Sequence, residues 1–307
     1  MGKLIVGEFT EKLCQAFTGF RDAVKGFKVI DIRTAAEQYY ITANARCEKA
    51  NDVLDLFETV MPPFPRCIFE FQAGNRRFVV HRGKEEGGIF EFGEGAALVE
   101  TTPVSPEEKI KLDSYYPEQD AAYSMTISFA WSADGEPYLF ARNMTVILSE
   151  EGFLVKDGNN RPVMELEEDV DITTWSDFFL IAVAPVLFAL TLMHCKNVSL
   201  DRVTTPLPLS QKNSKRRKQI EERKKYPPFE RHTIVIRDRK GRVVQTGQRL
   251  EGATKGLHWV RGHFHIYTTD RPLFGNPKLH GRYWVPAHIA GLNLERVIES
   301  DYLLEVA

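Results

Sequence analysis

Eighteen consecutive residues in the second half of the chain, from Phe178 to Cys195, carry no Asp, Glu, Lys or Arg side chain. A segment this apolar has to be buried, and its length just reaches that of a membrane-spanning helix. Acidic residues precede it and Lys196 follows it, as for a span whose C-terminal end is cytoplasmic. However, Pro185 lies in its middle and no tryptophan flanks its C-terminal end. We therefore expect a helix buried inside the protein and no membrane association.

The chain before this segment begins with a helical pattern. Residues 10–61 predict two helices, because apolar residues recur at spacings of three and four. The first helix is expected to be capped by Thr10. The second is expected to run from Thr34 to about Val60, where two prolines end it.

Residues 66–166 predict short strands separated by glycine-containing turns. The clearest strand is Met125–Trp131, in which large apolar and small residues alternate. The turn sequence at 133–136 then predicts a hairpin. We expect a meander or curved sheet with the N-terminal helices packed on one face.

The charge of the chain changes sign along its length. Residues 201–307 hold 21 Lys and Arg against 11 Asp and Glu, whereas residues 1–200 hold 19 against 31. A separate basic region fits nucleic acid or another polyanion as partner. The alternative is that the acidic part of the chain simply docks on the basic part.

The sequence therefore predicts an α+β protein in three parts. Residues 1–200 are expected to form an acidic α+β domain, and residues 231–307 a small basic β-rich module that is rich in histidine. Within this module, Leu292–Ser300 is expected to form one or two helical turns.

Residues 201–230 are expected to form a basic linker, stiffened by two prolines. A dense run of cations in it suits contact with phosphates, although a solvated connector explains the same composition. The candidate contacts are Lys215, Arg216, Arg217 and Lys218.

The most distinctive part of the module is His258–Gly291, which holds five of the eight histidines of the chain. Its first ten residues alternate and predict one strand with an apolar face and a polar face. Arg282–Val285 predicts a second strand, separated from the first by a long loop. We expect a hairpin whose polar face carries Arg261, His263, His265 and Tyr267.

A metal site is one interpretation of this face. His263 and His265 are spaced so that both can bind one ion, and His280 or His288 can supply a third ligand. The surrounding arginine and lysine residues repel a cation, so we expect no metal.

A metal-independent ribonuclease is a second interpretation. His263 or His265 would act as general base, because imidazole titrates near neutral pH. Arg261, Arg282 and Lys278 would stabilise the negative charge of the transition state.

Binding without catalysis is the favoured interpretation, because it needs no exact catalytic geometry. Cations would contact phosphates, and aromatic rings would stack on the bases of RNA or of other single strands. The candidate residues are Arg261, Lys278 and Arg282 for phosphates, and Tyr267, Tyr283 and Trp284 for bases. Equally, these side chains can form a purely structural hydrogen-bond network.

Other signals narrow the function class. The chain has no glycine-rich phosphate loop, no G-x-S-x-G motif and no kinase motif, so we expect no cofactor. Its four cysteines are scattered, which suits a reducing compartment, and no secretory signal is evident at the N-terminus. We expect a cytoplasmic protein.

Three segments are similar to a group of uncharacterised proteins encoded by tailed phages and prophages. They are MPPFPRCIFEF at 61–71, LMHCKNV at 192–198, and HWVRGHF with PLFG and YWVPAHIAG within 258–291. The resemblance implies a phage gene product that acts in the cytoplasm of the bacterial host, and it assigns no catalytic residue. A third class of function is thus an inhibitor or interaction protein whose acidic part binds a host protein.

Overall fold

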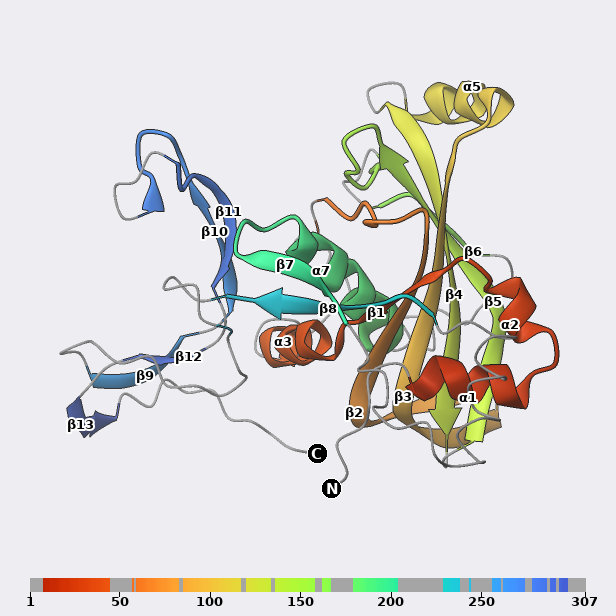
Figure 1. Ribbon diagram of the computed structural model, residues 1–307, viewed down its shortest axis with the longest axis horizontal. Coiled ribbons are helices and arrows are strands. Elements are labelled where there is room, and N and C mark those ends of the chain that lie inside the picture. Colours follow the sequence, from red (N-terminus) through yellow and green to blue (C-terminus); the bar gives the residue numbers. More distant parts are fainter. Residues whose placement is uncertain are drawn as a thin grey trace, which may run out of the picture.

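The computed structural model of the protein combines helices and strands and is rich in strands (Figure 1). It describes residues 8–44, 57, 59–82, 85–116, 120–133, 136–157, 162–166, 179–203, 229–237, 243, 256–260, 262–273, 278–285, 288–290 and 293–297.

A curved sheet of eight strands organises the fold (Figure 1). Its order is β6-β5-β4-β3-β2-β1-β8-β7. Strands β2 to β6 form an antiparallel meander, β1 is parallel to both β2 and β8, and β7 is antiparallel to β8. The strands are β1 (Lys28–Asp31), β2 (Arg66–Arg82), β3 (Glu85–Pro103), β4 (Ala121–Ala133), β5 (Glu136–Ser149), β6 (Met164–Leu166), β7 (Val198–Arg202) and β8 (Arg231–Ile236).

The strands of the meander are longer than predicted. Strand β2 has 17 residues and β3 has 19, so three of the glycines that predicted turns, Gly74, Gly87 and Gly88, lie within strands. The pairing of β2 with β3 shifts register between Gln72 and Arg76, and such irregularities bend a strand without ending it. The predicted strand at Met125–Trp131 is confirmed as part of β4, and its predicted hairpin with β5 is confirmed by their antiparallel pairing.

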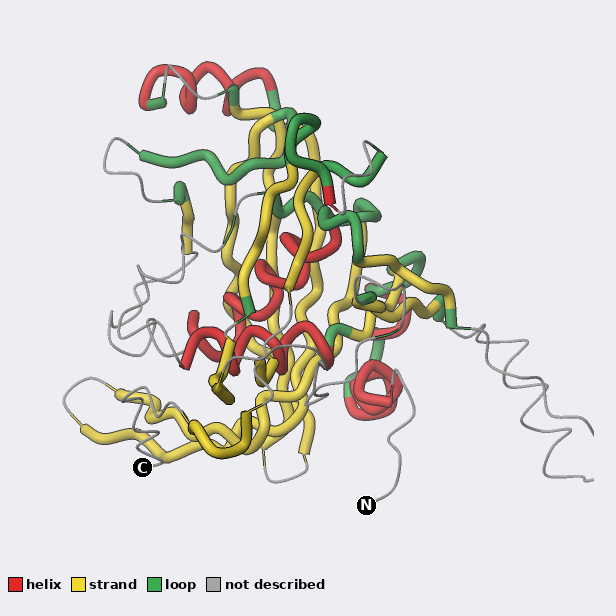
Figure 2. Tube along the Cα trace, turned by 90° about the vertical axis from the view of Figure 1, so that its left-hand side faces the viewer, coloured by secondary structure: helices red, strands yellow, loops and turns green. Residues whose placement is uncertain are grey.

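Helices cover both faces of the sheet (Figures 1 and 2). Side chains of β2 alternate between the two sides: Phe69 packs with α3 and α7, whereas Ile68 packs with α1 and α2. A further helix, α5, joins β3 to β4. The helical elements are α1 (Glu8–Ala16), α2 (Phe20–Ala23), α3 (Arg33–Asn44), α5 (Pro106–Tyr115), the π-helical turn η1 (Phe179–Val183) and α7 (Ala184–Met193).

The sequence predicts two helices within residues 10–61, and strand β1, which lies between them, is not predicted. Val29 and Ile30 are fully buried there, between β2 and β8. Of the second predicted helix, from Thr34 to about Val60, α3 confirms the first eleven residues, and residues 45–56 lie outside the described part. The prediction is wrong at its end, because Thr59 forms an isolated antiparallel bridge with Phe153. The partners that make residues 28–31 a strand are distant in sequence, and a local helical pattern does not reveal them.

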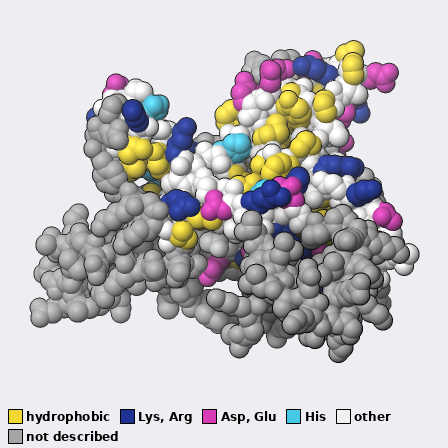
Figure 3. All heavy atoms as spheres, in the orientation of Figure 1, with side chains coloured by type: hydrophobic (Ala, Val, Ile, Leu, Met, Phe, Trp, Pro, Cys, Tyr) yellow, Lys and Arg dark blue, Asp and Glu magenta, His cyan; other side chains and the backbone are white. Residues whose placement is uncertain are grey.

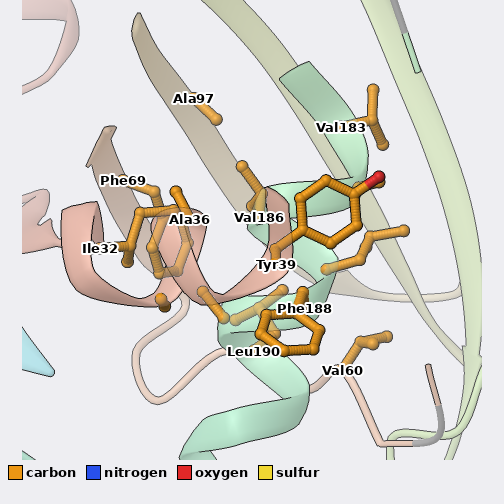
Figure 4. Close-up of a cluster of buried hydrophobic side chains, with 14 of the residues drawn as sticks. Ile32, Ala36, Tyr39, Val60, Phe69, Ala97, Val183, Val186, Phe188 and Leu190 are labelled. Carbon is orange, nitrogen blue, oxygen red and sulfur yellow. The ribbon is translucent and has the colours of Figure 1, made fainter. Parts of the chain in front are cut away.

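The apolar segment forms the centre of the core, as predicted. Nine of the ten residues of α7 are buried. Phe188 lies 5.7 Å from the ring of Tyr39 on α3, and both side chains point into the same apolar cluster (Figure 4). No helix in the described ranges has the length and apolar character that a membrane crossing needs.

The predicted start of the C-terminal module at residue 231 falls inside the main sheet. Strand β8 lies inside the main sheet, between β1 and β7. Residues 201–230 therefore do not link two domains, because the strands on either side of the basic run, β7 and β8, pair with each other in the same sheet. Composition alone puts β7 and β8 in different parts of the chain, whereas their pairing, which is distant in sequence, puts them in one sheet.

Two small sheets follow β8. Strands β10 (His263–Tyr267) and β11 (Gly281–Val285) form one, and β12 (His288–Ala290), β9 (Gly256–Val260) and β13 (Asn293–Val297) form the other. The helical turns predicted at Leu292–Ser300 are wrong, because β13 pairs with β9 there.

Thr10 lies inside the first turn of α1 rather than before it, and its partner is a buried carboxyl group from the sheet. The backbone N–H of Thr10 donates to Glu70 Oε1 over 2.8 Å, and its hydroxyl donates to the same oxygen. Glu70 thus supplies the acceptor that the helix N-terminus needs. Burial nevertheless raises the pKa of Glu70 above its ordinary value of 4.5, and the two Thr10 bonds and Arg231 offset only part of this effect.

We expect the substitution Glu70→Gln to remove a pH-dependent contribution to stability. A carboxyl group whose pKa is raised by folding stabilises the fold most below its unfolded pKa, and this contribution is lost as pH rises through the folded pKa. The melting temperature of the variant minus that of the wild type should therefore increase by a few degrees between about pH 4 and about pH 8. The exposed Glu107→Gln on α5 is the control and should show no trend; a constant or falling difference for Glu70→Gln would contradict the assignment.

Candidate nucleic-acid interface

Strands β10 and β11 form the predicted hairpin, and their pairing defines two faces. The cross-strand pairs are His263↔Val285, Phe264↔Trp284, His265↔Tyr283, Ile266↔Arg282 and Tyr267↔Gly281. Residues directly opposite each other share a face. We call His263, His265, Tyr267 and Tyr283 the polar face, and Phe264, Ile266, Arg282 and Trp284 the core face.

Through Phe264 and Trp284, the core face packs the hairpin onto the main core, whereas Ile266 on the same face is 63% exposed. The Trp284 side chain is only 1% exposed. Its ring lies edge-on to Phe188 of α7 at 5.1 Å and 4.7 Å from Phe264. The prediction that Trp284 stacks on bases is therefore wrong, because its ring is enclosed by the core.

Arg282 also departs from its predicted place. It belongs to the same face as Trp284, and its guanidinium carbon lies 3.9 Å from the centre of the Phe264 ring. This is a cation–π contact directed at the core. Arg282 is thus not beside His263 and His265, as the ribonuclease and phosphate-contact interpretations require.

A glycine adjoins the buried tryptophan where the predicted single strand divides. The chain leaves β9 at Val260 and enters β10 at His263. A Cβ atom at Gly262 would lie 2.5 Å from Trp284 Cζ2 and 3.0 Å from Thr42 Oγ1 of α3. Such distances are too short for any side chain, so glycine is required here by the close approach of the indole.

The polar face carries a row of three rings. The His265 ring lies 4.3 Å from the Tyr267 ring, and the Tyr267 ring lies 5.4 Å from that of Tyr283 at an interplanar angle of 87°. His265 is exposed, and the two tyrosines are half-buried. His263 belongs to the same face and is half-buried as well.

The loop between the two strands adds exposed basic residues. Arg271, Lys278 and His280 are exposed, together with the acidic Asp270. Figure 3 shows histidine and Lys or Arg side chains at the upper left, where Figure 1 places β10 and β11. Of the predicted site residues, the structure thus brings His263, His265 and Tyr267 together on one face and places Lys278 and His280 on the adjoining loop.

Arg261 and the basic run of Lys215, Arg216, Arg217 and Lys218 lie outside the described residues, as does the side chain of His288. Within the described part of the chain, no three His, Cys, Asp or Glu residues are grouped so as to hold a metal ion. The alternative metal set of His263, His265 and His280 is therefore not assembled.

A shallow pocket of about 370 Å³ lies elsewhere, between α2 and strands β3 to β5. Phe20, Phe27 and Leu98 form its apolar wall, and Thr126, Ser128 and Asn143 form a polar one. Glu100 is the ionisable group among its described lining residues, and it pairs with Arg66 over 2.7 Å. The pocket contains none of the predicted site residues.

No protein-family profile, curated protein or solved structure matches this chain. The interpretation of the hairpin therefore depends on its own chemistry.

We expect Gly262→Ala to destabilise the protein by about 1–3 kcal/mol, because the added methyl group overlaps the indole. Trp284→Phe removes the two indole carbons nearest to that methyl group. The double variant should lose less unfolding free energy than the sum of the losses in the two single variants. Denaturant unfolding of all three variants measures these losses.

Gly93→Ala is the matched control for this test. Its added Cβ atom would lie 3.1 Å from the hydroxyl oxygen of Ser132 and 3.8 Å from the backbone oxygen of Ser132, so the cost should be smaller. Additive energies for the Gly262 and Trp284 changes would show that the contact is not tight.

Proposed function

We propose that the protein binds single-stranded nucleic acid, preferably RNA, through the polar face of the β10–β11 hairpin. The observation that carries the proposal is the row formed by the rings of His265, Tyr267 and Tyr283. Aromatic side chains at an accessible strand surface bind unpaired bases by stacking, and this contact tolerates any sequence. RNA is preferred because its unpaired loops present bases in this way.

Charge supports the same proposal. Lys278, Arg271 and His280 are exposed on the loop beside the ring row. Lys and Arg contacts to phosphates supply most of the affinity in sequence-independent binding and make it depend on salt. The excess of Lys and Arg in residues 201–307 acts in the same direction.

The ribonuclease alternative receives less support from the geometry. It requires guanidinium groups near the histidines, and Arg282 lies on the core face instead. We therefore treat catalysis as an outcome of the test. The origin in a phage and the action in the host cytoplasm are part of the proposal and follow from the resemblance alone.

The test is fluorescence-polarisation binding of a labelled single-stranded RNA across a salt series. Replacing Tyr267 or Tyr283 by Leu should raise Kd about five- to hundredfold, because one stacking contact is lost. Phe at either position should keep most of the affinity. The control is Tyr115→Leu on α5, where the tyrosine is 68% exposed and remote from the hairpin, and it should bind as the wild type does.

The salt series and the RNA itself give further results. Lys278→Ala should reduce the salt slope by about one. The RNA is also checked for cleavage after the assay. Cleavage that is lost in His263→Ala or His265→Ala would establish a ribonuclease. Absence of binding at low salt would refute the proposal and favour a protein partner.

A further inference from the structure

The turn between α7 and β7 contacts the backbone of β11. The N–H of Lys196 donates to the carbonyl oxygen of Arg282 over 2.9 Å. One residue further, the side-chain amide of Asn197 donates to the carbonyl oxygen of Trp284 over 2.7 Å and accepts the N–H of Trp284 over 2.9 Å. The amide of Asn197 thus bonds Trp284 as a neighbouring strand would, with one donor and one acceptor.

Asn197 also holds the end of β8. Its side-chain nitrogen donates to the carbonyl oxygen of Arg237 over 3.0 Å, and its backbone carbonyl oxygen accepts the Arg237 N–H over 2.9 Å. A single side chain therefore joins the turn after α7, the end of β8 and strand β11. In Figure 1 the hairpin lies next to the ends of β7 and β8, where these contacts are made.

The orientation of the polar face follows from these contacts. Neighbouring residues of a strand point to opposite faces, so fixing Trp284 in the core directs Tyr283 to the other side. Asn197 fixes the backbone of Trp284, and the enclosed indole fixes its side chain. Both constraints act on the same residue, because packing of the indole fixes the side chain but does not replace the partners that Asn197 supplies to the N–H and carbonyl oxygen of Trp284.

We propose that Asn197 is the positioning residue of the nucleic-acid interface, which it does not itself touch. The inference depends on the proposed function. Loss of its amide would let β11 move relative to α7, and the ring row would then have to be ordered each time a ligand binds. Such ordering weakens affinity without removing any ligand contact.

The test compares Asn197→Ala and Asn197→Asp with the wild type. Ala removes all three side-chain bonds, whereas Asp keeps the acceptor for the Trp284 N–H and loses both donated bonds. Each variant should bind the single-stranded RNA about three- to tenfold more weakly with an unchanged salt slope. Hydrogen exchange of residues 281–285 should become faster, and that of β4 should not.

A matched destabilised variant separates positioning from general stability. Leu13→Ala removes a buried side chain of α1 on the opposite side of the sheet, and it should lower the melting temperature without changing Kd for RNA. If Leu13→Ala weakens binding as much as Asn197→Ala does, the role of Asn197 is merely structural and the inference fails.

The remaining outcomes are distinct. If the tyrosine variants lose affinity and both Asn197 variants bind as the wild type does, the positioning role is overturned and the proposed function stands. If the wild type does not bind RNA at low salt, both fail.

Discussion

The burial of α7 is the constraint on which the rest of the structure depends. Nine of its ten residues are buried, and the long strands of the sheet, helix α3 and the β10–β11 hairpin all pack against it. Phe188 shows the arrangement in one side chain, because its ring contacts Tyr39 of α3 and both Phe264 and Trp284 of the hairpin. A helix with apolar residues on every side needs neighbours on every side. The hairpin is the neighbour that also presents a polar surface outward.

This double role explains the composition of the hairpin. The face that covers α7 carries Phe264 and Trp284, and the opposite face carries imidazole and phenol rings. Core packing and the outward polar surface are therefore assigned to alternate residues of the same two strands. A change on the polar face leaves the core contacts in place, whereas a change on the core face alters the orientation of the polar face as well.

The sequence predicts those features that local pattern determines. The buried helix, strand β4 and the existence of the hairpin all follow from periodicity, and so does the polar face at His263, His265 and Tyr267. Arg282 shows a mistake that the same rule could have prevented, since Arg282 and Tyr283 are consecutive in a strand and cannot share a face. By contrast, β1, the place of β8 and the bonds of Asn197 depend on partners far along the chain, which no local pattern reveals.

The pairing of β1 with β8 has a consequence for synthesis on the ribosome. Lys28 and Glu230, which flank this pairing and form an ion pair, are separated by 202 residues. At ordinary translation rates, roughly 10 to 40 seconds pass between the emergence of the two strands. During that time one edge of β1 has no native partner, and Val29 and Ile30 are exposed to other nascent or unfolded chains. The native sheet is therefore completed only after β8 has emerged, and its yield should depend on what protects that edge until then.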